Sequence, residues 1–106
     1  MTKLMLYREC KAIDVNGKES QVKVGVEQPK CLNGVWNCKV VLGVILQDQR
    51  HAYGADAWDA VQKAMVMVYL ELRVQKLAGW KFLWFNDETD DLTVLLPDFG
   101  KSTMDF

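Results

Sequence analysis

The stretch from Asp56 to Leu77 constrains the fold more than any other, because it is the only long segment of the 106 residues with the pattern of a helix. It contains no Gly or Pro, and it is rich in residues that favour helices, such as Ala, Leu, Met, Gln, Lys and Glu. Asp56 is placed to cap the first turn, and Gly79 to end the helix in a left-handed conformation. The sequence therefore predicts one helix of about six turns.

One side of this helix has the spacing of a buried face. At about 100° per residue, six apolar residues fall on one stripe, with Trp58 and Tyr69 beside it. We expect this stripe to form the core: Ala57, Val61, Ala64, Met65, Val68 and Leu72.

The opposite side carries a second apolar stripe among its polar residues, formed by Val66, Leu70, Val74 and Leu77. A helix that is apolar nearly all round is normally buried on two sides. Two interpretations follow. Either a loop or the C-terminal tail of the same chain covers this stripe, or it is a surface for another protein chain.

The segments before the helix alternate as strands do. Residues 3–15 and 19–26 flank Asn16-Gly17, a strong hairpin signal because both residues tolerate positive φ. Gly25 within the second strand predicts a bulge. The hydrophobic segment Val35–Leu46 predicts a central strand with both faces partly covered.

The remaining segments are shorter. Cys31–Gly34 predicts a turn or loop, and Arg50–Tyr53 a short strand before the helix. After the helix, the aromatic segment Trp80–Phe85 and the segment Leu92–Leu96 predict two strands, separated by an exposed loop at residues 86–91.

Strands, one long helix and further strands indicate an α+β fold. We expect an antiparallel sheet of about five strands with the helix packed across one face, in the order β-β-β-(short β)-α-β-β. Residues 1–97 would form a single domain, and residues 98–106 a flexible C-terminal tail.

The charge balance restricts the function. A formal net charge of −1 disfavours direct nucleic-acid binding, which needs a basic face. The sequence has neither a signal peptide nor an apolar run long enough to span a membrane, so we expect a cytoplasmic protein without a membrane partner.

The residues suited to chemistry do not form a motif. Three cysteines, Cys10, Cys31 and Cys38, indicate reduced thiols rather than disulfides. A zinc site of these cysteines with His51 lacks the close ligand pairs that such sites use. We expect no catalytic residue, metal or cofactor. An enzyme using His51 with Cys10 or Cys38 is the weakest hypothesis.

Acidic residues concentrate after Phe82, where six acids stand against one base, Lys101. Four of them form a candidate docking surface for a basic protein, since a concentrated charge steers association over long range. A plain solvated loop is the alternative for these four: Asp87, Glu88, Asp90 and Asp91.

The strand motif W-x-C at Trp36–Cys38 precedes the helix entry A-Y-G-x-D-A at Ala52–Ala57, and Glu71-Leu72 follow near the helix end. Together these motifs resemble a family of small bacterial domains of unknown function. The resemblance implies a bacterial origin and a similar fold, without an assigned activity.

Two functions fit this pattern. The first is a bacterial immunity protein that binds and neutralises a cognate protein toxin without catalysis. If the toxin is a nuclease, the four acids would occupy its basic cleft, and Val66, Leu70, Val74 and Leu77 would supply the apolar contacts. The alternative is a homodimeric structural or regulatory domain joined through the helix.

Overall fold

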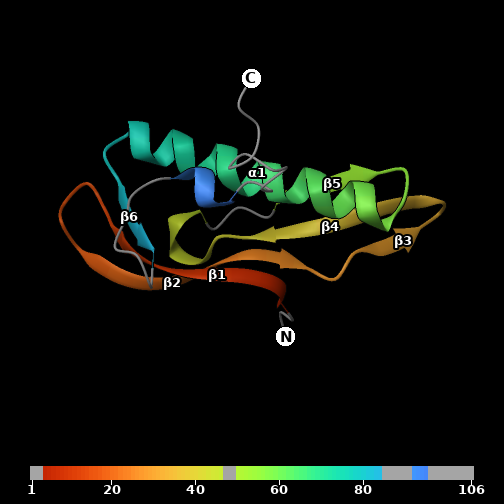
Figure 1. The fold of residues 1–106 in the computed structure, drawn as a ribbon, viewed down its shortest axis with the longest axis horizontal. Helices are drawn as coiled ribbons and strands as arrows, with labels where there is room; N and C mark the ends of the chain where they lie inside the picture. Colours follow the sequence, from red (N-terminus) through yellow and green to blue (C-terminus); the bar gives the residue numbers. More distant parts are fainter. Residues whose placement is uncertain (1–3, 47–49, 85–91, 96–106) are drawn as a thin grey trace, which may run out of the picture.

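The computed structural model describes residues 4–46, 50–84 and 92–95. These residues form two layers: an antiparallel six-stranded sheet, and one long helix that lies across one face of it (Figure 1). This confirms the predicted α+β fold.

The sheet combines three hairpin-like pairings of consecutive strands with two pairings, β2–β4 and β1–β6, between strands that are not consecutive in sequence. Strand β5 pairs with one edge of β4, and β3 and β2 pair with successive parts of its other edge. Beyond β2, the sheet continues with β1 and then β6. All five pairings are antiparallel. The strands are β1 (Leu4–Ile13), β2 (Glu19–Glu27), β3 (Lys30–Leu32), β4 (Val35–Val41), β5 (Arg50–Gly54) and β6 (Lys81–Trp84).

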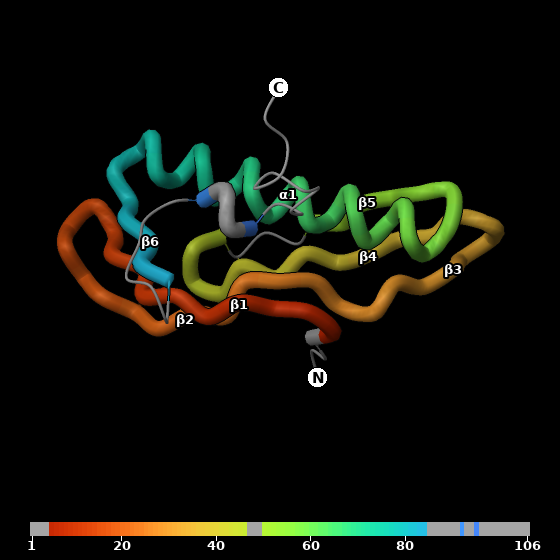
Figure 2. The backbone as a smooth tube through the Cα atoms, in the orientation of Figure 1, coloured from red at the N-terminus to blue at the C-terminus, as the bar shows by residue number. Residues whose placement is uncertain are grey.

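Helix α1 (Ala57–Leu77) connects β5 at one edge of the sheet to β6 at the other. Figure 2 shows the chain crossing over the sheet in this connection. The opposite face of the sheet has no helix over it among the described elements, so all of the helical packing is on one side.

The predicted N-terminal cap of the helix is confirmed. The Asp56 carboxylate accepts a hydrogen bond from the Asp59 N–H at 2.8 Å, and the Asp59 carboxylate accepts one from the Ala55 N–H at 2.9 Å. Two N–H groups that the helix itself cannot pair are thereby satisfied by reciprocal bonds, which stabilise its first turn.

The C-terminal end also follows the prediction. Gly79 has φ +115°, and its N–H donates to the Lys76 carbonyl, while the Trp80 N–H donates to the Gln75 carbonyl. These two bonds form a Schellman motif, which turns the chain sharply into β6.

The first hairpin is confirmed, although its turn differs from the expected one. Gly17 has positive φ and Asn16 does not. The Gly17 N–H donates to the Asp14 carbonyl, and the Asp14 carboxylate accepts from the N–H groups of Asn16 and Lys18. A longer loop organised by Asp14 therefore replaces a two-residue turn.

The bulge lies elsewhere than predicted. The register shifts between Leu4 and Leu6, so the extra residue is Met5 on β1, not Gly25 on β2. Gly25 instead allows a close approach between backbones, because a Cβ at this position would lie 2.7 Å from the Tyr7 Cα.

The predicted turn or loop at Cys31–Gly34 is confirmed at Asn33 and Gly34 but was wrong for Cys31 and Leu32, which lie in a strand. Lys30–Leu32 is a strand paired with the first residues of β4, and Asn33 and Gly34 both have positive φ in the two-residue turn between them. Such a turn matches the twist of the flanking strands, which explains why Asn-Gly forms a tight hairpin here.

The prediction of a strand through Leu46 was also wrong. β4 ends at Val41, and Gly43–Ile45 form a short 3-10 helix, η1. Gly43 has φ +59°, a conformation that a strand does not use. As a consequence Ile45 is buried and Val44 is exposed, the reverse of the alternation expected from an extended strand.

After the helix, β6 confirms the expected alternation, with Phe82 and Trp84 buried and Leu83 on the other face. The prediction of a last strand was wrong, since Leu92–Leu95 form a 3-10 helix, η2, packed against α1. The predicted acidic loop and the predicted tail at residues 98–106 lie outside the described residues.

The core lies between α1 and the sheet. On the helix its fully buried positions are Ala60, Ala64, Val68 and Leu72. Ala60 was not among the predicted core residues, whereas Ala57, Val61 and Met65 are only partly buried. Two alanines at the centre of the stripe let the helix approach the sheet closely. On the sheet the largest fully buried side chains are Phe82, Val24, Val26, Cys10 and Cys38, and the larger Trp84 is only 3 % exposed.

Candidate partner-binding surfaces

The outward face of α1 presents the second apolar stripe to solvent. Its four side chains are 42 to 82 % exposed: Val66, Leu70, Val74 and Leu77. They lie on the side of the helix opposite the buried stripe, so packing against the sheet cannot cover them. We call these four residues the outer stripe.

Basic side chains border the outer stripe. Lys63 and Arg73 are exposed on the same side of the helix, and Lys76 lies in its last turn. Lys63 forms an ion pair with Asp59 at 3.0 Å, one turn away. The outward face therefore combines exposed apolar side chains with a partly compensated positive border.

The four predicted acidic site residues, Asp87, Glu88, Asp90 and Asp91, lie outside the described residues, so their role stays a prediction. The described residues on either side of this segment, Trp84 and Leu92, are both buried in the core. The acidic segment is thus joined at both ends to the packed part of the molecule.

A second apolar surface was missed by sequence reasoning. Trp58, which we expected beside the core, is 76 % exposed. It lies next to a cavity of about 690 Å³ whose lining includes Met5, Leu6, Pro29 and Met65.

The helix-free face of the sheet carries a shallow pocket of about 510 Å³ around His51, lined by both polar and apolar side chains. The His51 Nδ1 lies 3.4 Å from the Asn37 side-chain oxygen, and the His51 ring stacks on Tyr53 with ring centres 6.5 Å apart. Nearby, the Lys39 ammonium lies 3.8 Å from the Glu27 carboxylate. An amide can orient an imidazole but cannot exchange a proton with it, so this contact does not form a general-base pair.

The structure separates His51 from the two cysteines proposed to act with it. Cys38 pairs with Ala52 across β4 and β5, and both side chains are buried toward the helix. His51 pairs with Lys39, one residue along, and therefore points to the opposite face. No thiolate–imidazole pair can form between these positions without inverting a strand.

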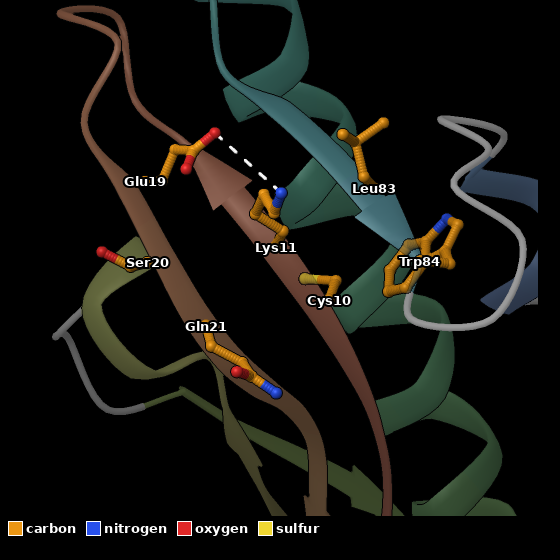
Figure 3. A pocket seen from close by; sticks show the side chains of 7 residues that line it. All are labelled: Cys10, Lys11, Glu19, Ser20, Gln21, Leu83 and Trp84. Atoms are coloured by element: carbon orange, nitrogen blue, oxygen red, sulfur yellow. Dashed lines mark ion pairs between the residues drawn. The ribbon is translucent and has the colours of Figure 1, made fainter.

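The buried thiols are also protected from ionisation. Burial raises the pKa of Cys10 to about 11, and burial followed by the nearby Glu27 carboxylate raises the pKa of Cys38. Cys10 lines a pocket of about 360 Å³ together with Trp84, Lys11 and Glu19, and the last two form an ion pair at 4.0 Å. Figure 3 shows these side chains. A thiol that stays protonated is a poor nucleophile.

The three cysteines are free, and Cys31 is the exposed one. Within the described residues there is no group of three or more His, Cys, Asp or Glu side chains that could hold a metal ion. In the same part of the chain, no helix combines the length and the apolar character needed to cross a bilayer.

Comparison with known proteins identifies the family of this chain. A family model described as a domain of unknown function (DUF6968) matches residues 8–95. The chain belongs to this family. The match begins within β1, ends with η2 and includes both resemblance motifs, Trp36–Cys38 and Ala52–Ala57. This confirms the resemblance to a domain of unknown function. No curated protein and no solved structure matches the chain.

Proposed function

We propose that this protein is a bacterial immunity protein, which binds a cognate protein toxin and neutralises it without catalysis. One observation carries the proposal: four large apolar side chains, the outer stripe, are exposed on a helix that is capped at both ends and packed on a sheet. An exposed apolar surface of this kind is typical of protein interaction sites.

The rigidity of α1 favours binding. Association costs free energy when side chains and backbone must be ordered at the interface. The backbone of α1 is already fixed by its caps and by the burial of Leu72 and Val68. Its Val and Leu side chains have few rotamers, so most of the free energy gained by covering them is retained on binding.

The charges of this protein fit a partner that has both an acidic or neutral area and a basic area. The basic residues beside the outer stripe, Lys63 and Arg73, fit an acidic or neutral border on the partner. The acidic segment at residues 87–91 fits a basic area. If the toxin is a nuclease, its substrate cleft is such a basic area, and the acids of the immunity protein would exclude nucleic acid from it.

The proposal places the protein in the cytoplasm of the bacterium that it protects. The cognate toxin would be encoded beside it, and the two proteins would meet before or after delivery of the toxin by a neighbouring cell. Nucleic acid and membrane are not partners in this proposal.

The experiment is a binding titration between the purified chain and the toxin domain encoded by the adjacent gene. We expect a complex with a Kd below the micromolar range. The double variant Val66→Asp/Leu70→Asp should weaken it at least about a hundredfold, because charge is introduced at the centre of the apolar contact. Leu32→Asp, at a 63 % exposed position on β3, is the matched control and should bind normally.

The acidic segment is tested separately. Replacing Asp87, Glu88, Asp90 and Asp91 with Ser should slow association and reduce its dependence on salt, since long-range steering is screened by ions. Absence of a complex at micromolar concentration would rule out the neighbouring gene product as the toxin and remove the main support for this function.

A homodimer is the second candidate, and the spacing of the outer stripe favours it. Residues 66, 70, 74 and 77 follow each other at intervals of four, four and three, as in the contact seam of packed helices. Light scattering over a range of concentrations tests this function. A dimer that becomes a monomer in Val66→Asp/Leu70→Asp would support it, and a monomer at every concentration would exclude it.

A further inference from the structure

We propose that the groove between α1 and the first half of β1 binds an extended apolar peptide of a partner protein, with a carboxylate of the peptide placed at Arg8. This site is distinct from the outer stripe and does not depend on the proposed toxin interaction.

The groove consists of two adjoining cavities of about 690 and 200 Å³ that share Leu6 and Met65. Trp58 and Pro29 line one end, and Val68 and Leu95 the other. Met5 lines it as well, because it is the bulged residue of β1, and a bulge changes the direction of a side chain. Two methionines give the lining an adaptable shape.

In the described part of the sheet, the first half of β1 is an edge strand. β6 pairs with β1 only at Cys10–Ile13, so no described strand pairs with the outer edge at Leu4–Glu9. The backbone N–H and C=O groups along such an edge favour the addition of another strand. An extended peptide could therefore form hydrogen bonds with β1 while alternate side chains enter the groove.

The length of the groove sets the length of the peptide. From Trp58 to Val68 the helix rises by about 15 Å, at roughly 1.5 Å per residue. A strand rises by about 3.3 Å per residue, so a segment of about five residues would span the groove. Two or three of its side chains, at alternate positions, would be buried.

Charge selects one end of the peptide. Among the described residues, Arg8 is the only charged side chain that lines the two cavities, and it makes no ion pair within that part of the chain. A guanidinium beside an apolar groove pairs well with a carboxylate, which it can bind through two parallel hydrogen bonds. The occupant is thus apolar along its length and acidic near Arg8.

Both partner surfaces can be used at the same time. Trp58 and Met65 line the side of α1 that faces β1, whereas the outer stripe lies on the side opposite the sheet. A peptide in the groove would not cover Val66 or Leu70.

The test is a selection from a phage-displayed library of random twelve-residue linear peptides on the immobilised full chain. We expect enriched sequences with apolar residues at alternate positions and Asp or Glu near one end. The most enriched peptide is then synthesised with a fluorescent label, and its binding is measured by anisotropy. N-methylation of a backbone amide in its centre should abolish binding if the peptide adds to β1 as a strand.

Three variants locate the bound peptide. Trp58→Ala should weaken binding at least about tenfold, since exposed aromatic residues often dominate such contacts. Arg8→Gln should weaken binding of the acidic peptide. It should leave unchanged the binding of an analogue in which the acidic residue of the peptide is replaced by Asn or Gln. Leu70→Ser, on the outer stripe, is the control and should bind normally. Circular dichroism of each variant verifies folding.

Several results would overturn the proposal. One is the absence of an enriched alternating pattern, and another is binding that Trp58→Ala does not change. A third is binding that appears only after Phe99, Met104 and Phe106 are replaced by Ser, which would mean that the chain's own C-terminal residues occupy the groove. A concentration-dependent dimer lost in Trp58→Ala would assign the groove to a second copy instead.

Discussion

Gly25 has a structural role that its residue type alone explains. It pairs with Tyr7 on one side and Val41 on the other, and a Cβ there would lie 2.7 Å from the Tyr7 Cα and closer still to the Leu6 carbonyl. The two backbones would have to separate. We therefore expect Gly25→Ala to destabilise the protein by about 3 kcal/mol, measured by urea unfolding.

Gly17→Ala is the matched control for this prediction. Gly17 has φ +86° and open space around its Cα, so only the left-handed conformation is penalised, at about 1–2 kcal/mol. Equal losses in the two variants would contradict the proposed backbone clash at Gly25.

The Cys10 thiol makes stability depend on pH. Its pKa is about 11 in the folded chain, because burial disfavours the thiolate, and near 9.0 when exposed. The folded state therefore binds the thiol proton more tightly than the unfolded state does. The resulting contribution to folding stability is fully present below pH 9 and is lost as pH rises toward 11. The loss from this group is on the order of 3 kcal/mol.

Urea unfolding of the wild type and of Cys10→Ala at several pH values measures this effect. The variant loses some stability at every pH because a buried sulfur is removed. The difference between wild type and variant should shrink between pH 9 and 11. A constant difference across this range would contradict the assignment to Cys10.

At the scale of elements, the first turn of α1 depends on two carboxylates. Asp56→Ala should cost about 1 kcal/mol of unfolding free energy, because the Asp59 N–H loses its acceptor. Asp56→Ser keeps an acceptor oxygen and should restore most of the loss. Thermal unfolding followed by circular dichroism distinguishes the two variants, and equal melting temperatures would contradict a capping role.

Asp59 makes the stability of this turn depend on pH in the acidic range. The backbone N–H of Ala55, and then the Lys63 ammonium, lower the pKa of the Asp59 carboxyl below its ordinary range. Its contribution is present above the unfolded pKa and is lost as pH falls through the folded pKa. Asp59→Asn should therefore be less stable than wild type at neutral pH and approach it in acid.

Two leucines separated by one residue show that α1 has two different faces. Leu72 is fully buried and Leu70 is 49 % exposed. Leu72→Ala should cost about 3 kcal/mol, through lost burial and a residual cavity, and Leu70→Ala less than about 1 kcal/mol. Urea unfolding measures both. A large loss in Leu70→Ala would show that the chain itself covers the outer stripe, contrary to the proposed function.

At the scale of the whole molecule, the sheet is unevenly supported. Cys10–Ile13 on β1 have strands on both sides, whereas Leu4–Glu9 have a described strand only on the β2 side. We expect alternate amides of Leu4–Glu9 to exchange with solvent at least about tenfold faster than those of Cys10–Ile13, measured by NMR. Uniform protection along β1 would mean that its edge is already occupied, which would count against the peptide groove.

The molecule therefore has surfaces of three kinds around one core. The outward face of α1 is apolar with a basic border, and the groove beside β1 is apolar with one arginine. The helix-free face of the sheet mixes polar and apolar side chains around His51. Only the first of these was identified among the candidate sites from the sequence. The groove was missed because its residues come from four separate segments, near Met5, Pro29, Trp58 and Leu95.

Local sequence determined the helix and its ends. Asp56, the absence of Gly and Pro, and Gly79 act through neighbours within one or two turns, so their effect is the same in any tertiary context. The same reasoning predicted the first hairpin and the alternation of Phe82 and Trp84 in β6, since a strand has a fixed period of two.

Tertiary structure decided the remaining features. Val35–Leu46 has a continuous strand pattern, yet the chain turns at Gly43. The turn allows Leu42 and Ile45 to be buried together, which a continuing strand would not allow. Leu92–Leu95 would suit a strand, yet packing on α1 makes it a 3-10 helix. Which apolar residues remain exposed was also decided there: a sheet covers one side of a helix, and the periodicity of α1 alone cannot show what covers the other.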